Sequence, residues 1–374
     1  MDHDTCKKPS PRCASTRPRL VLAFAAALTL WPAAARATSS DDIEDGEQSF
    51  FDPAIIERPD EAPFFRSGHI FYNQSEQDGA PPFADIETIN QGEWSRYLGG
   101  KVPDKSLGYL LYAMKVPELD KLVFSFEGKS PTLGKDAAAV KAGLDAVNDR
   151  GKVLRALYYL GFAKRCEPIA LRALAEDGWD AEKLAAQRAR DNETVTKLLG
   201  GSEGLMAAAR DDAFLKERYH FQRLRLLFYG GRHAEAQRYY GANVGEVQSA
   251  SSVRYRFLST AAGAYYRDKQ YGMANYLYSL VFGGYGPLKR SAFRSFKPVE
   301  DRDWKASLAL TRSDRERAVL WQLLGITADG PAAIERIYAL APASDLLPLL
   351  LVREVNKAEE DWTLNDERRG DTIG

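Results

Sequence analysis

The sequence predicts an all-α protein in which helical hairpins stack into an α-solenoid. Strand-like alternation of apolar and polar residues is scarce, one helix carries two apolar stripes, and a helix–turn–helix unit repeats along the chain. With 374 residues, 45% of them hydrophobic and 28% charged, the chain can bury a large core. This composition excludes a disordered chain and a disulfide scaffold.

The first 37 residues predict a signal peptide. Several basic residues precede an apolar run at 20–31, which is short for a membrane span and leads to Ala35-Arg36-Ala37. We expect cleavage after Ala37 and an exported protein, periplasmic or secreted, with no stable membrane anchor. An uncleaved amino-terminal anchor is the alternative. Cleavage would leave Cys166 as the single cysteine, so no internal disulfide is expected.

Two segments precede the predicted helices. Residues 38–49 (TSSDDIEDGEQS) are acidic and polar, which predicts a flexible arm. Residues 50–88 interleave aromatic residues with prolines. Proline breaks helices, yet so many rings would not remain in water. We therefore expect an extended segment that docks its aromatic side chains on the folded body.

Residues 89–358 are expected to form the helical-repeat domain, followed by a polar tail at 359–374. The spacing of Asn90-Gln91-Gly92-Glu93 predicts a capping box for a short helix that ends before Gly99. Gly200 and Gly201 indicate a turn after a helix at 181–199. The other expected helices cover 103–114, 117–128, 134–148, 151–165, 213–229, 252–267, 271–282, 302–310, 313–326, 331–341 and 345–358.

The expected helix at 213–229 carries the evidence for stacking. At 100° per residue, its large apolar side chains fall on two faces. One face holds Phe214, Phe221, Leu224 and Phe228, and the other holds Leu215, Tyr219 and Leu226. A helix on the outside of a globule needs one apolar stripe, so two stripes predict neighbours on both sides.

An internal repeat supports this architecture. Shifting the sequence by 38 residues aligns Arg218 with Arg256 and Tyr240 with Tyr278. Each unit is a long helix, a polar turn and a second helix with alanine in its middle. The unit resembles the tetratricopeptide-type helical hairpin, whose usual period is 34 residues. The longer period and the missing consensus Trp, Gly and Pro positions make it a degenerate form.

The chain also resembles an uncharacterised family of secreted bacterial helical-repeat proteins over residues 50–358. The matching stretches are 157–166 (LYYLGFAKRC), 214–219 (FLKERY), 262–278 (AGAYYRDKQYGMANYLY) and 337–357. This resemblance implies a helical-repeat fold and export. It carries no assigned chemistry.

Motifs for catalysis are absent from the sequence. It contains no HExxH zinc motif, no phosphate-binding loop and no dinucleotide-binding GxGxxG, so no cofactor, metal or catalytic residue is expected. The rival hypothesis is an envelope-glycan-cleaving enzyme with a non-standard carboxylate site, such as Glu93 beside Trp94 or Glu360 and Asp361 beside Trp362. The simpler interpretation is that Glu93 caps its helix and Trp94 packs into the core.

The charge distribution favours a binding protein. Residues 213–297 hold 14 Lys and Arg against four acidic residues, a formal charge of +10, whereas the rest of the chain after Ala37 carries −15. Such segregation indicates complementarity to an anionic partner or to the protein's own acidic parts, including the arm at 38–49. Tyrosines are abundant in the same segment, and Arg with Tyr is typical of binding surfaces.

We therefore expect a non-enzymatic scaffold that binds a protein or an anionic envelope polymer through a basic, Tyr-rich surface. The residues expected to form this surface are Arg218, Arg225, Arg256, Arg267, Tyr266 and Tyr278. Nucleic acid is not an expected partner, because of export and the acidic balance of the mature chain. The plainer alternative is that the tyrosines fill spaces between helices while the arginines extend into solvent.

Overall fold

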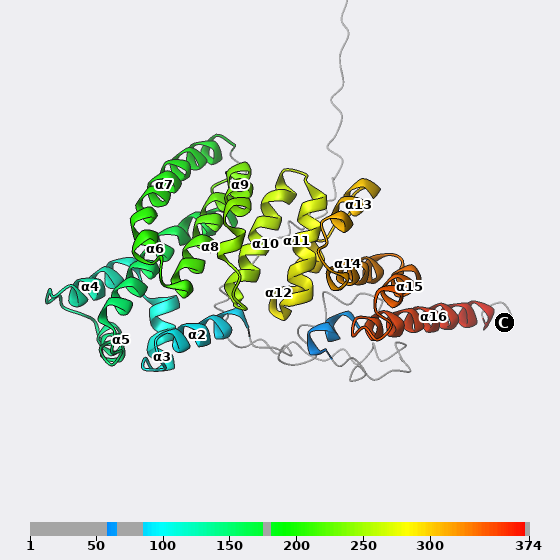
Figure 1. The fold of residues 1–374 in the computed structure, drawn as a ribbon, viewed down its shortest axis with the longest axis horizontal. Coiled ribbons are helices and arrows are strands. Elements are labelled where there is room, and N and C mark those ends of the chain that lie inside the picture. Colours follow the sequence, from blue (N-terminus) through cyan, green and yellow to red (C-terminus); the bar gives the residue numbers. More distant parts are fainter. Residues whose placement is uncertain (1–57, 66–84, 175–180, 371–374) are drawn as a thin grey trace, which may run out of the picture. The chain divides into compact units, whose positions relative to one another are not determined.

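A computed structural model describes residues 58–65, 85–174 and 181–370 (Figure 1). Contacts divide the chain into residues 1–37 and 38–374, and all described residues belong to the second unit. The predicted signal peptide and the predicted acidic arm lie outside the described residues.

The prediction of an all-α protein is confirmed, because the described ranges contain helices and turns and no strand. The first helices are α2 (Ile86–Tyr97), α3 (Asp104–Gly108), α4 (Val116–Phe126), α5 (Lys135–Asp145), α6 (Arg150–Leu174) and α7 (Ala181–Ala208). The central helices are α8 (Ala213–Tyr229), α9 (His233–Asn243), α10 (Ser252–Arg267), α11 (Tyr271–Gly284) and α12 (Gly286–Ser295). The last helices are α13 (Asp301–Ala309), α14 (Asp314–Thr327), α15 (Gly330–Leu340) and α16 (Leu347–Gly370). Three shorter helical turns are η2 (Pro59–Phe64), η3 (Tyr109–Ala113) and η4 (Val244–Glu246).

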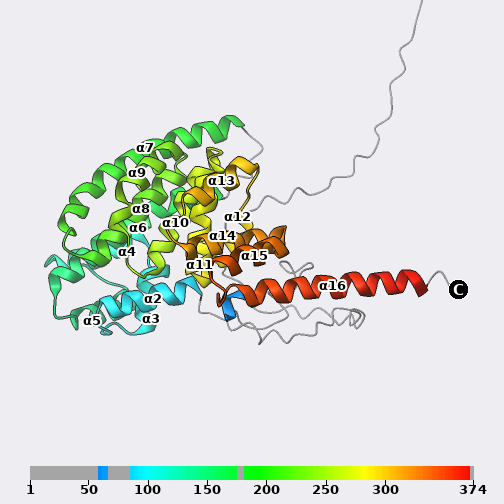
Figure 2. The same ribbon diagram turned by 45° about the vertical axis from the view of Figure 1, so that its right-hand side comes forward.

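Helix α8 is buried on two sides, as its two apolar stripes predict. Leu215, Tyr219 and Leu226 belong to one apolar cluster, which includes side chains of α2 to α7. Phe221 and Leu224 belong to a second cluster, which continues through α10, α11 and α14. Helix α8 contacts α6, α7, α9 and α10, and Figures 1 and 2 show these helices side by side.

Phe214 is an exception to the predicted stripes. Its ring stacks on Tyr97 at 4.2 Å between centroids and meets the edge of Trp94 at 5.0 Å, so it joins the first cluster instead of the second. The reason is its position in the first turn of α8, where the neighbour is α2. Phe228, at the other end of α8, packs against the second cluster as expected.

Helix boundaries follow local capping chemistry. Helices α8 and α10 begin and end where the sequence predicts them, and the Asp212 carboxylate caps α8 by accepting from Leu215 N at 3.1 Å. The capping box at Asn90 is wrong. Helix α2 begins five residues earlier, because the Asp85 carboxylate, in place of Asn90, accepts from Thr88 N at 2.6 Å and supplies the cap.

Other boundaries also differ from prediction, including that of α6, which continues to Leu174 past the expected end at 165. Helix α7 runs through Gly200 and Gly201, so the turn expected there is wrong; glycine inside a helix costs only about 1 kcal/mol. Helix α12 was not among the expected helices; it opens with Gly286-Pro287, and proline is well tolerated at the first positions of a helix. Helix α16 continues to Gly370, past the predicted limit at 358, and no proline interrupts that stretch.

A short piece of the predicted aromatic segment docks in the core. Phe64 is fully buried and meets the ring edges of Phe282 at 5.5 Å and Phe293 at 5.1 Å. Phe65 is 4% exposed in the same cluster. The other rings of that segment, Phe50, Phe51, Phe71, Tyr72 and Phe83, lie outside the described residues.

Within the described ranges, no helix is both long enough and apolar enough to cross a membrane.

Candidate functional site

The structure separates the six predicted surface residues into two groups. Arg218, Arg225 and Arg256 lie on the neighbouring helices α8 and α10, whereas Tyr266, Arg267 and Tyr278 lie at the end of α10 and on α11. Arg218 and Tyr278 are each 2% exposed, so neither can contact a partner in this conformation. Arg225, Arg256 and Tyr266 are half-buried, and Arg267 is exposed.

Arg218 has a structural partner. Its Nη2 lies 2.5 Å from Glu93 Oε2, and the Glu93 carboxylate also accepts from Ser252 N at 2.7 Å and Ser252 Oγ at 2.9 Å. Ser252 is the first residue of α10, so this carboxylate lies at a helix amino terminus, where negative charge is stabilised. Burial lowers the pKa of Arg218, and the charge of Glu93 opposes that effect. The buried pair thereby joins α2, α8 and α10.

These contacts bear on Glu93 and Trp94 as candidate glycan-cleaving residues. Glu93 was expected to cap its own helix, α2, but it caps α10 instead. Trp94 is 2% exposed and packs against Tyr97, Tyr159 and Phe214, so it offers no free ring face to a sugar. The side chains of Glu360, Asp361 and Trp362 are outside the described part of the structure.

Arg225 and Arg256 have a different environment. The Arg256 guanidinium lies 4.6 Å from the centre of the Phe221 ring, and Arg225 is one helical turn beyond Phe221 on α8. The two guanidinium groups are therefore neighbours across the α8–α10 contact. Neither guanidinium makes a hydrogen bond or ion pair with any residue that the structure describes. The Arg225 guanidinium lies 5.7 Å from the centre of the Tyr229 ring. Burial lowers the pKa of Arg256, and the nearby charge of Arg225 lowers it further.

Tyrosines and one cysteine surround this arginine pair. The charge of Arg256 acts on Tyr112, Tyr159 and Tyr285, and that of Arg225 acts on Cys166. Burial nevertheless raises the pKa of Cys166 to about 12 and that of Tyr285 to about 12. Burial also raises the pKa values of Tyr112 and Tyr159. None of these groups supplies a negative charge at neutral pH. We call Arg225, Arg256, Tyr112, Tyr159 and Tyr285 the Arg–Tyr site.

Other basic residues of the 213–297 segment are neutralised within the protein. Fully buried Lys289 lies 2.7 Å from Asp60 Oδ2 and 3.2 Å from Glu61 Oε1. Lys216 pairs with Glu246 at 2.8 Å, and Arg223 lies 4.0 Å from Glu203. The charge segregation along the sequence is therefore partly cancelled in space, by carboxylates that include Asp60, Glu61, Glu93 and Glu203 from outside the segment.

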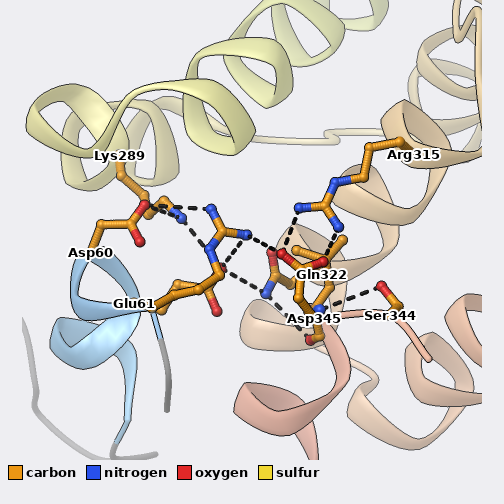
Figure 3. A network of polar contacts seen from close by, with 9 residues as sticks. Asp60, Glu61, Lys289, Arg315, Gln322, Ser344 and Asp345 are labelled. Carbon is orange, nitrogen blue, oxygen red and sulfur yellow. Dashed lines mark hydrogen bonds and ion pairs between the residues drawn. The ribbon is translucent and has the colours of Figure 1, made fainter.

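The Lys289 contacts belong to a larger polar network (Figure 3). Arg58 lies 3.1 Å from Glu61 and 3.5 Å from Asp345, and Asp345 pairs with Arg315. Gln322 Nε2 donates to Glu61 Oε1 at 3.2 Å. Three cations and three carboxylates thus balance where η2 meets α12, α14 and the turn before α16, which gives this network a structural role.

Two hollows of about 490 and 440 Å³ flank the stacked rings of Tyr97 and Phe214. The first is lined by Lys152, Arg155, Asp211 and Asp212, and the second by Arg96, Glu93, Glu217, Arg218, Ser249 and Ser251. The Tyr97 hydroxyl donates to Asp212 at 2.6 Å, and the Glu217 carboxylate accepts from Gln248 N and Ser249 N. Their polar walls are thus engaged in holding α8 and the turn before α10. No local sequence signal marks these hollows, since each combines residues from distant segments.

Among the described residues, no group of three or more His, Cys, Asp or Glu side chains could hold a metal ion. Comparison of the chain with protein-family models, with curated proteins and with solved structures gives no match. The chemistry of the Arg–Tyr site is therefore argued from its own geometry.

Proposed function

We propose that this chain is an exported, non-enzymatic α-solenoid of degenerate tetratricopeptide-like hairpins that binds an acidic partner at the Arg–Tyr site. The partner is a protein segment or an anionic envelope polymer. One observation carries the proposal: two neighbouring, half-buried arginines lack any carboxylate or other hydrogen-bond partner among the described residues. Like charges placed together without an anion destabilise a fold, so this arrangement favours binding of an external anion.

The packing of consecutive helices supports the solenoid part of the proposal. Helices α8 to α11 contact one another in sequence, α8 also contacts α10, and α14, α15 and α16 are mutually packed. The predicted signal peptide supports export, which would yield a mature chain that begins at Thr38.

Capture on immobilised polyglutamate at rising salt tests the binding function. Wild-type protein is expected to be retained at low ionic strength and released as salt screens the charges. The variant Arg225→Gln/Arg256→Gln should bind at least about tenfold more weakly, since a hydrogen bond to a charged group contributes about 1.5–3 kcal/mol. Its fold should persist, because the change removes a repulsion.

The matched control is Arg302→Gln/Lys305→Gln on α13. This control also removes two positive charges, but from side chains that are 79% (Arg302) and 73% (Lys305) exposed. Equally weakened binding of polyglutamate by both variants would mean that binding depends only on net charge, which would contradict a defined site. Failure of the wild-type protein to bind polyglutamate at low salt would contradict the proposed function itself.

A further inference from the structure

We propose that the Arg225–Arg256 pair binds a phosphate monoester, that is, a doubly charged phosphate group carried by the acidic partner. This inference rests on the proposed function, because it assigns the chemistry of the group that enters the same site.

The charge at the site selects a dianion. Of the three arginines on this part of α8 and α10, Arg218 is neutralised by Glu93 at 2.5 Å. Arg225 and Arg256 have no such partner in the described ranges, and the Cys166 thiol, on which the charge of Arg225 acts, remains neutral because burial raises its pKa to about 12. The site therefore carries two uncompensated positive charges. One carboxylate would cancel one of them, whereas a phosphate monoester carries −1.5 to −2 at neutral pH.

The donors also fit phosphate. Each guanidinium can present two parallel N–H groups to phosphate oxygens, and a monoester offers three terminal oxygens. Tyr159 is 5% exposed and its Oη accepts from Gln222 Nε2 at 3.5 Å, so it is not counted as a donor to the ligand. The Tyr112 hydroxyl instead donates to Glu87 O at 2.8 Å, so it lines the site without a free proton.

Partial burial strengthens these contacts. Arg225 and Arg256 are half-buried, and the Arg256 guanidinium is held over the Phe221 ring at 4.6 Å. An arginine held against a ring has lost part of its side-chain freedom before the ligand arrives, so less entropy is lost on binding.

Calorimetric titration with phenyl phosphate and benzenesulfonate tests the assignment. Both probes carry the same ring, but only phenyl phosphate gains a second charge as pH rises through about 6. Its affinity is expected to increase about tenfold between pH 5 and pH 8, while the affinity for benzenesulfonate stays unchanged. The cysteine and tyrosines of the site keep their protons over this range, because their pKa values are raised.

Arg225→Gln should abolish this pH-dependent gain, and Arg302→Gln should retain it. Equal affinity for the two probes at pH 8 would overturn the inference, and so would tighter binding of inorganic phosphate than of phenyl phosphate.

Binding of polyglutamate without binding of phenyl phosphate would overturn the phosphate assignment and leave the proposed function standing. Binding of phenyl phosphate without polyglutamate would support the phosphate assignment and contradict a general site for acidic partners.

Discussion

At the scale of single residues, the partner of each cation determines its role. Arg218 and Arg256 occupy equivalent positions in the 38-residue repeat, yet one is bound by Glu93 and the other has no carboxylate among its described neighbours. The sequence identified both arginines but could not distinguish them, because Glu93 lies 125 residues before Arg218. Periodicity reports which face a side chain occupies and carries no information on such distant contacts.

Lys289 provides a test of the structural ion pairs. Lys289→Met should lower the free energy of unfolding by up to about 3–5 kcal/mol, since it removes one of the two cations, Lys289 and Arg58, that neutralise the fully buried Glu61. Lys305→Met is the control, because its pair with Asp301 is 73% exposed on both sides and should contribute less than about 1 kcal/mol. Urea unfolding of both variants measures the difference. Similar, small losses would mean that the network of Figure 3 does not stabilise the fold.

At the scale of helices, local sequence signals predicted the boundaries of some helices well, but they predicted poorly which residues are buried by packing against other helices. The sequence located α8 and α10 because an apolar pattern marks each of them, although only α8 has a local cap, from Asp212, and α10 is capped by the distant Glu93. It placed a turn at Gly200 where α7 continues, since the packing of Leu199, Leu205 and Met206 against the core outweighs the low helix propensity of glycine. It also missed that Tyr278, expected on a surface, is buried on α11.

Alanine substitutions at two helical glycines can distinguish the effect of tight helix packing from the effect of helix propensity. A Cβ on Gly325 of α14 would lie 2.7 Å from Ala333 Cβ of α15 and 3.1 Å from the Leu350 side chain, so Gly325→Ala should destabilise the protein by about 1–3 kcal/mol. A Cβ on Gly200 of α7 meets nothing within 4 Å, so Gly200→Ala should stabilise it by about 0.5–1 kcal/mol. Thermal unfolding reports both changes. A stabilising Gly325→Ala would contradict the close approach of α14 and α15.

At the scale of the described unit, the distribution of charge connects fold to function. The helical class followed from composition and periodicity, because these are properties of many residues at once. Cancellation of the basic segment by Asp60, Glu61 and Glu93 could not be predicted, since these carboxylates lie more than a hundred residues away in sequence. After this cancellation, Arg225 and Arg256 are neighbouring half-buried cations without an ion pair to any described residue, whereas Arg238, Arg267, Lys269 and Lys297 are exposed to solvent. The proposed function depends on the Arg225–Arg256 pair.

The most direct measurement of this claim follows the arginine Nε–Hε resonances by NMR during titration with polyglutamate. Arg225 and Arg256 should shift together and in proportion to binding, because their guanidinium groups acquire a carboxylate. Arg218 should stay unchanged, since Glu93 already occupies it at 2.5 Å. Binding that leaves Arg225 and Arg256 unshifted, or that shifts exposed arginines alone, would contradict the account.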